Sequence, residues 1–275
     1  MKKLFLSLVS SILLIACTGD GPTLFKPSSS GLPYEVLVVC DKEMWEAPSG
    51  RALFNVLDTD IPAIPQPERS FRISQTSPEG FDNLLLTFRN VIEVDINPQR
   101  YTQTKYKFRR DPYSTPQVIM TIQSPSEKEF KEYVEANGQT IIDFFTSPEM
   151  NRELRRLEKP NAHNGRFLDS LNAKFGCEMF VPIELQNIKS GKDFIWVSDM
   201  QSVNSVVLNF AVYSYPYTDR SNFTLENFLQ KRDSIMKANL PGGRPNSYMK
   251  TEHDYVVMKE TEFRERYMQE VRGLW

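Results

Sequence analysis

The order of strand-like and helix-like stretches constrains the fold of this chain more than any other feature. Residues 34–40, 91–96 and 205–215 are short apolar or alternating runs of the kind that β-strands have. Helix-like stretches stand between such runs, and Ser126-Glu127-Lys128-Glu129 has the pattern of a capping box at a helix start. The order has no regular βαβ rhythm. It therefore predicts an α+β fold, with mixed, largely antiparallel sheets and helices packed on one face.

Three further stretches carry specific structural expectations. Ser77-Pro78-Glu79 and Ser147-Pro148-Glu149 each combine an N-cap serine with a proline at the first helical position, so each predicts a helix start. In the second helix we expect Arg152, Arg155 and Arg156 to form a solvated face with neighbouring glutamates. Residues 178–185 predict a strand.

The chain begins with a second constraint, MKKLFLSLVSSILLIACTGD. The apolar run from 4 to 16 would span only about 20 Å as a helix, which is short of the ~30 Å hydrocarbon core of a bilayer. Two lysines precede it, as in a secretory signal peptide. Leu14-Ile15-Ala16-Cys17 resembles a lipobox, which implies cleavage between Ala16 and Cys17 and lipidation of Cys17. An ordinary secretory peptide is the alternative.

These patterns divide the chain into four segments. Residues 1–16 are the predicted signal peptide, and 17–33 are a flexible tether rich in Gly, Pro, Ser and Thr. Residues 34–160 and 161–275 are predicted as N-terminal and C-terminal α+β halves, the second of which could be incomplete. The two halves could be similar subdomains, although no residue-level repeat is visible.

Composition narrows the class of function. The formal net charge is −2 and no basic block is present, which argues against nucleic-acid binding. Beyond the tether, Cys40 and Cys177 could pair, because the predicted compartment is oxidising. The favoured interpretation is that each is a small buried strand residue.

Five stretches of the chain resemble one family. They are IPQPERSFRIS, RNVIEVDI, FIWVSDM, RDSIMKANLPG followed by SYMKTE, and EVRGLW. They are similar to domain of unknown function 4837, a family of uncharacterised bacterial envelope lipoproteins, over nearly all of the chain beyond the signal peptide. The resemblance implies a lipid-anchored globular protein and no activity to carry over. Family members continue past the EVRGLW stretch, so it also implies a C-terminally shortened member.

The sequence offers no recognisable catalytic constellation. The two histidines, His163 and His253, lack metal-binding spacing, and both are expected in solvated loops. Neither a G-x-S-x-G elbow nor a phosphate-binding glycine motif occurs. We therefore predict no cofactor, no metal site and no identifiable catalytic residue.

One aromatic cluster is a candidate binding surface. Tyr213, Tyr215 and Tyr217 surround Pro216, and exposed aromatic rings can stack on sugars or bind peptides. The structural alternative is a strand end whose rings pack on the next element.

The sequence thus favours a lipid-anchored cell-envelope protein that acts as a non-enzymatic binding or structural module. The predicted partners are the membrane, through the anchor, and an envelope protein, peptide or glycan. Thr18 after Cys17 favours the outer membrane. The alternative is an envelope hydrolase whose carboxylates the sequence does not identify.

Overall fold

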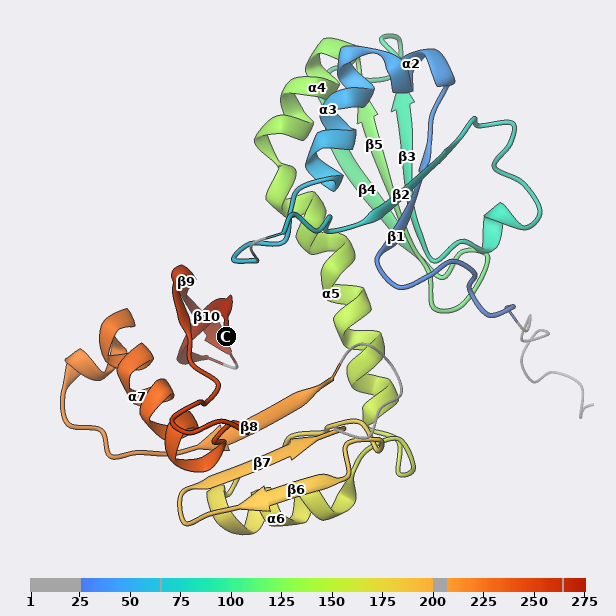
Figure 1. The fold of residues 1–275 in the computed structure, drawn as a ribbon. Coiled ribbons are helices and arrows are strands. Elements are labelled where there is room, and N and C mark those ends of the chain that lie inside the picture. Colours follow the sequence, from blue (N-terminus) through green and yellow to red (C-terminus); the bar gives the residue numbers. More distant parts are fainter. Residues whose placement is uncertain (1–25, 65, 200–206, 264) are drawn as a thin grey trace, which may run out of the picture.

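The computed structural model describes residues 26–64, 66–199, 207–263 and 265–275. Its strands form a five-stranded, a three-stranded and a two-stranded sheet (Figure 1). The two smaller sheets are antiparallel, whereas the five-stranded sheet is mixed. The predicted α+β class is confirmed. Among the helices of the described residues, none has both the length and the apolar character that crossing a bilayer requires.

The five-stranded sheet has the order β2-β1-β3-β5-β4. Strands β2, β1, β3 and β5 run parallel to one another, and β4 pairs antiparallel with β5 at one edge of the sheet. Strands β1 and β5 are buried along nearly their whole length, as expected of continuous apolar runs. The five strands are β1 (Glu35–Val39), β2 (Arg72–Thr76), β3 (Asn90–Ile96), β4 (Lys105–Arg110) and β5 (Val118–Ser124).

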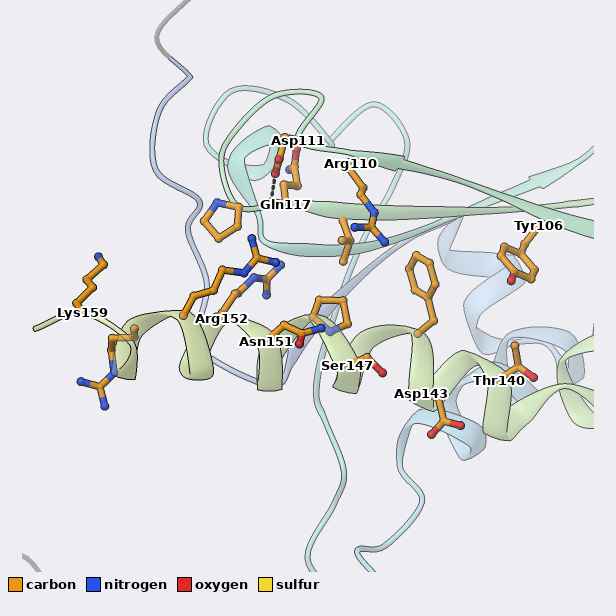
Figure 2. Close-up of a pocket in the computed structure, with 16 residues that line it drawn as sticks. Tyr106, Arg110, Asp111, Gln117, Thr140, Asp143, Ser147, Asn151, Arg152 and Lys159 are labelled. Atoms are coloured by element: carbon orange, nitrogen blue, oxygen red, sulfur yellow. Dashed lines mark hydrogen bonds between the residues drawn. The ribbon is translucent and has the colours of Figure 1, made fainter. Parts of the chain in front are cut away.

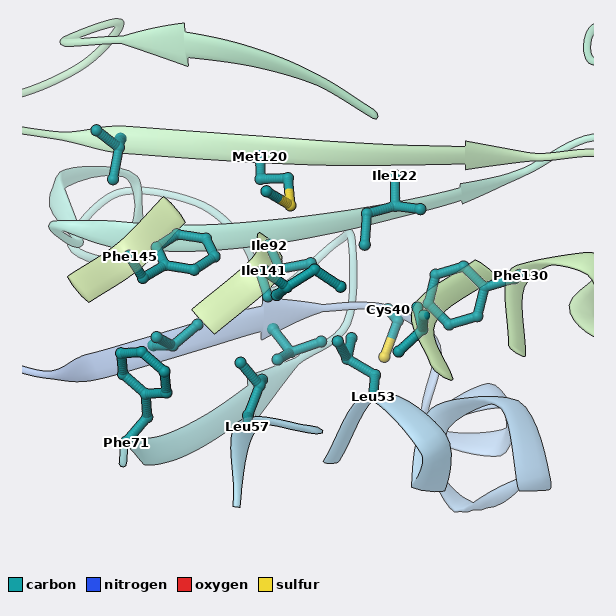
Figure 3. Packing of buried hydrophobic residues seen from close by; sticks show 14 of the residues in the cluster. Cys40, Leu53, Leu57, Phe71, Ile92, Met120, Ile122, Phe130, Ile141 and Phe145 are labelled. Carbon is teal, nitrogen blue, oxygen red and sulfur yellow. The ribbon is translucent and has the colours of Figure 1, made fainter. Parts of the chain in front are cut away.

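Helices α3, α4 and α5 cover one face of this sheet, and their apolar side chains fill the main core (Figures 1 and 3). Leu53, Phe130 and Phe145 are completely buried there against β1, β3 and β5. The N-cap half of the predicted capping box is confirmed, because the Ser126 side chain accepts a hydrogen bond from the Glu129 amide at 3.2 Å. The helices of this part are α2 (Lys42–Glu46), α3 (Pro48–Leu57), α4 (Glu127–Ala136) and α5 (Gly138–Leu157).

The other face of the sheet has a smaller apolar cluster. Leu37, Val91 and Ile119 pack there against Phe88, next to the 3-10 helix η1 (Leu85–Thr87). The prediction of a helix that starts at Ser77 is wrong. Residues 77–84 contain turns instead, and only the short helix η1 follows them. Apolar side chains at helical spacing can also cover a sheet from a series of turns.

The residues after 160 form the other two sheets. The three-stranded sheet has the order β6-β7-β8, and α6 packs against it through Phe167 and Leu171, which are fully buried. The predicted strand over 178–185 is wrong. That segment forms only an isolated bridge between Pro182 and His163, while Val181 and Leu185 fill the core from a loop. The elements are α6 (Gly165–Phe175), β6 (Asn187–Ser190), β7 (Phe194–Ser198), β8 (Asn209–Tyr213), η2 (Arg220–Phe223), α7 (Leu225–Asn239), β9 (Glu252–Phe263) and β10 (Arg266–Leu274).

The two cysteines beyond the tether differ in environment. Cys40 is buried at the end of β1, as predicted, whereas Cys177 is exposed in the loop after α6. The interpretation of Cys177 as a buried strand residue is therefore wrong. Both thiols are free.

Candidate functional site

A cavity in the N-terminal part lies between α5 and the β4–β5 hairpin. It has a volume of about 610 Å³, within the range of small-molecule sites. In Figure 2, Arg110 extends from the end of β4 towards α5, and Arg152 extends from α5 towards the hairpin. Ser147, Asn151 and Lys159 also line it from the helix side.

Helix α5 supplies most of the cavity wall because it is longer than the predicted helix: it begins at Gly138 and not at Ser147. Ser147-Pro148 does not start a helix, since Pro148 lies inside the single helix from Gly138 to Leu157. A proline in a helix interior removes one amide donor, so this helix carries a local defect beside the cavity. The hairpin wall is fixed by Gln117, whose side-chain amide donates to the carbonyls of Leu86 and Phe88 at 2.7 Å each.

Cationic side chains outnumber carboxylates in the cavity lining. Arg152, Arg155, Arg156 and Lys159 come from the end of α5 and the residues just after it, and Arg110 comes from β4. The lining carboxylates are Asp111 and Asp143. Asp111 accepts the Gln117 amide hydrogen at 2.6 Å, and Asp143 accepts from the Gln139 side chain at 2.9 Å. The cavity is therefore electropositive.

Arg152, one of the cations that line the cavity, belongs to a buried polar cluster between α5 and β3. The Glu149 carboxylate accepts hydrogen bonds from Arg152 at 2.6 Å and from the Asn90 amide at 2.7 Å. The Arg89 Nε lies 3.4 Å from the same oxygen, Oε1, but outside hydrogen-bonding geometry. One carboxylate is thus shared by two largely buried guanidinium groups, so these three side chains carry an excess positive charge. The Asp111 carboxylate of the cavity lining also acts electrostatically on Arg152.

This arrangement corrects the expected solvated face of α5. Glu149 is only 4% exposed, and the Arg152 side chain is also largely buried. Burial, the largest cause, lowers the pKa of Arg152, although Glu149 opposes the shift. The expectation holds for Arg156, which forms an exposed pair with Glu153 at 2.6 Å. The signal that sequence reasoning missed is the polar Asn90 at the start of a strand whose first three residues are buried.

The three candidate tyrosines take part in two separate ring contacts. Tyr213 and Tyr215 stack with ring centroids 6.4 Å apart, whereas Tyr217 packs against Phe223 at 5.7 Å. Tyr213 lines a second, smaller cavity. Cys17 and the cleavage site after Ala16 lie outside the described residues.

The two histidines lie in different settings. His163 contacts the carbonyl oxygen of Leu157 through Nδ1 at 2.7 Å, so it helps to end α5. His253 lies in β9 and not in the expected loop, and its Nε2 is 3.6 Å from the Asp233 carboxylate. Within the described ranges, no group of three or more His, Cys, Asp or Glu side chains is arranged to hold a metal ion.

Comparison with protein families gave two matches on adjacent parts of the chain. Residues 29–158 match the family described as Domain of unknown function (DUF8532). Residues 166–275 match the family described as Domain of unknown function (DUF4837). The second match supports the resemblance stated from the sequence, but only for the C-terminal part, because a different family covers the N-terminal part. Searches of curated proteins and of solved structures found no match.

Proposed function

We propose that this protein is a lipid-anchored binding module of the bacterial cell envelope, without catalytic activity of its own. We also propose that the cavity between α5 and the β4–β5 hairpin holds an anionic ligand that carries phosphate or carboxylate groups. The anchor rests on the lipobox-like sequence around Cys17. The ligand class rests on the charge of the cavity.

The observation that carries the ligand class is the shared carboxylate of Glu149. Its one negative charge faces both Arg89 and Arg152, and Arg152 also lines the cavity. A buried net charge is costly unless another charge or water compensates it. An anion in the cavity would supply the missing charge, and guanidinium groups bind phosphate and carboxylate oxygens in pairs of parallel hydrogen bonds.

Further cations are available to such a ligand. No ion pair that involves Arg110, Arg155 or Lys159 occurs within the part of the chain that the structure describes. The helix rises about 6 Å between Arg152 and Arg156, so the positive charges are spread along the cavity. This spread favours a ligand with more than one anionic group, such as a phosphorylated or acidic glycan or a lipid headgroup.

The helix dipole alone does not account for this arrangement. Cations near a helix C-terminus are stabilising, which explains Arg155 and Arg156 in the last turn of α5. It does not explain Arg110, which comes from β4, or the burial of Arg152 behind a shared counter-charge. The hydrolase alternative has weaker support, because Asp111 and Asp143 are both engaged in hydrogen bonds within their own segments.

A binding experiment with matched variants tests the ligand class. It uses a soluble form that starts at Thr18, ahead of the first described residue, and three probes: short-chain polyphosphate, polygalacturonate, and vesicles containing phosphatidylglycerol. Calorimetry and vesicle sedimentation measure the affinities. The double variant Arg110→Ala/Arg155→Ala should bind at least about tenfold more weakly, because two charge-assisted contacts are lost.

The control is Arg166→Ala, which removes an exposed positive charge from α6 outside the cavity. It should leave binding unchanged. Binding of vesicles alone would identify a lipid headgroup, and binding of a soluble polymer would identify a glycan-like ligand. The proposal fails if no probe binds, or if the control variant weakens binding as much as the double variant does.

The anchor has its own test. A clickable fatty acid should label the full-length protein in cells and should not label Cys17→Ser. The labelled protein should also fractionate with membranes. Absence of label from the unchanged protein would remove the lipoprotein proposal without affecting the binding experiment.

A further inference from the structure

The C-terminal part of the chain contains a second cavity, of about 240 Å³, which is distinct from the cationic one. Its walls come from β7 and β8, helix α7, the loop before β9, and the β9–β10 hairpin, which are yellow-orange to red in Figure 1. All of its lining residues lie between 196 and 275, so it shares none with the first cavity. Any ligand of this cavity is therefore held by the C-terminal part alone.

Aromatic and apolar side chains form most of this second cavity. Four rings line it, from Trp196 on β7, Tyr213 on β8, Phe228 on α7 and Trp275 after β10. Met236 and Met249 add thioethers, and Leu, Val and Ala side chains complete the wall. Such a surface favours a flat apolar ligand, because rings stack well on rings and methionine adapts to their shape.

Only three of the lining side chains carry hydrogen-bonding groups besides the rings: Asn209, Arg232 and Thr251. Asn209 accepts from the indole N–H of Trp196 at 3.1 Å. The Thr251 hydroxyl donates to the Asp233 carboxylate at 2.7 Å and accepts from Arg232 at 2.8 Å. Two of the three groups are thus already engaged with the protein.

Arg232 is the polar group that remains available to a ligand. All of its hydrogen bonds within the described residues use one nitrogen, Nη1, which contacts Asp233, Thr251 and the Met249 carbonyl. These bonds hold the guanidinium rigidly while leaving Nε and Nη2 without partners there. The side chain is only 11% exposed, and the Trp275 ring lies 4.8 Å from the guanidinium carbon. A pair of donors on one edge of an ordered guanidinium matches the two oxygens of a carboxylate.

We propose that this second cavity binds a small aromatic carboxylate. Its ring lies against Trp275 and the other aromatic walls, and its carboxylate accepts from Nε and Nη2 of Arg232. A sugar fits less well, because most of its hydroxyl groups would lose water without gaining a partner. The Tyr213 phenol is neutral near pH 7 and does not repel the carboxylate, because its ordinary pKa is 10.0 and burial, the largest cause, raises it further.

The test uses 2-naphthoate as the probe, with 2-naphthamide and methyl glucoside for comparison, on the soluble form that starts at Thr18. Calorimetry should show that 2-naphthoate binds about tenfold more tightly than 2-naphthamide, because the amide keeps the ring but loses the charge-assisted pair. The comparison tests Arg232 without altering the protein, which matters because Arg232 also holds Thr251 in place.

A variant tests the aromatic wall. Trp275→Ala should weaken naphthoate binding by about three- to tenfold, because one ring contact is lost. Trp275 is 61% exposed, so its removal should not disturb folding. Trp45→Phe, in α2, is the matched control and should bind as the unchanged protein does. The proposal is overturned if 2-naphthoate does not bind, if amide and acid bind equally, if Trp275→Ala has no effect, or if methyl glucoside binds more tightly.

Discussion

The carboxylate of Glu149 lies 2.6 Å from the guanidinium of Arg152, and 3% of the Glu149 side chain is exposed. The two residues are one turn apart on α5, a spacing that usually gives a weak surface pair. Here the pair is buried against β3, and Asn90 of that strand hydrogen-bonds to both side chains. Arg89, which immediately precedes β3, brings the second guanidinium. The pair therefore fastens α5 to the sheet and fixes one side of the cationic cavity.

The first prediction concerns the stability that this buried pair provides. Glu149→Gln removes the counter-charge of Arg89 and Arg152, so we expect it to lower the free energy of unfolding by about 3 kcal/mol or more. Glu153→Gln is the control, because it breaks the exposed pair with Arg156 and should cost less than about 1 kcal/mol. Urea unfolding of both variants measures the difference. Equal costs would show that the Glu149 cluster is not energetically special.

The second prediction concerns the close approach of α2 and α3 at Gly50. A Cβ at this position would lie 2.5 Å from the Trp45 Cα and 2.6 Å from the Trp45 carbonyl oxygen, and would also clash with the Met44 carbonyl. These are backbone atoms, so one of the helices must move. We expect Gly50→Ala to destabilise the protein by about 1–3 kcal/mol.

Gly165→Ala is the matched control for Gly50→Ala. Gly165 is the first residue of α6, and a Cβ there would meet nothing within 4 Å. Alanine loses less backbone entropy than glycine on folding, so this variant should be neutral or more stable by up to about 1 kcal/mol. Thermal unfolding compares the two variants. If both substitutions changed the stability equally, the contact between α2 and α3 at Gly50 would not be tight.

Local sequence patterns predicted much of this fold because local interactions determine it. The Ser126 cap forms as expected, and strands appear at β1, β3 and β5, where apolar residues run or alternate. The predictions that were wrong concern segments whose conformation depends on tertiary contacts. Pro148 fits the start of a helix by local rules, yet it is accommodated inside α5 because the helix packs along the sheet through Ile141 and Phe145.

The candidate sites were less predictable, because residues distant in the sequence assemble both cavities. Nothing in the sequence relates Asn90 to Glu149 or Arg110 to Arg155, since each pair joins a strand to a distant helix. Of the three candidate tyrosines, only Tyr213 lines either of the two cavities described above. Alternation along the chain does not show which rings come together in one cavity wall. The family-like stretch in the C-terminal part begins at Arg232-Asp233, but the contact of these two residues with Thr251 depends on the fold.

The third prediction concerns thiol reactivity. Burial, followed by the charge of Asp41, raises the pKa of Cys40 to about 11. At pH 8 only about one Cys40 thiol in a thousand would be ionised, and the thiolate is the reactive form. Iodoacetamide should therefore label the exposed Cys177 of the native protein at pH 8 and leave Cys40 unmodified, as peptide mass spectrometry would show.

Denaturation supplies the control for this labelling. In urea both cysteines should react at similar rates, because burial no longer protects Cys40. Rapid labelling of native Cys40 would contradict its buried environment. Failure to label either residue until a reductant is added would show that the two thiols pair with each other.

The fourth prediction concerns the pH dependence of stability at Asp233. Burial favours the neutral acid, but hydrogen bonds from the hydroxyl and amide of Thr251, at 2.7 and 3.0 Å, outweigh it together with His253 and Arg232. The pKa of Asp233 is therefore held below its ordinary value of 3.8. A carboxyl group whose pKa is lower in the folded state stabilises the protein above the unfolded pKa. This contribution is lost as the pH falls through the folded pKa.

Asp233→Asn should consequently destabilise the protein most near neutral pH, and the loss should shrink as the pH falls below about 4. Urea unfolding at pH 7, 5 and 3 measures this change as a difference between the variant and the unchanged protein. Asp169→Asn, at an exposed position on α6, is the control and should differ from the unchanged protein by less than about 0.5 kcal/mol at each pH. A loss for Asp233→Asn that stays constant from pH 7 to pH 3 would mean that the charge of Asp233 does not stabilise the fold and that only its shape and hydrogen bonds matter.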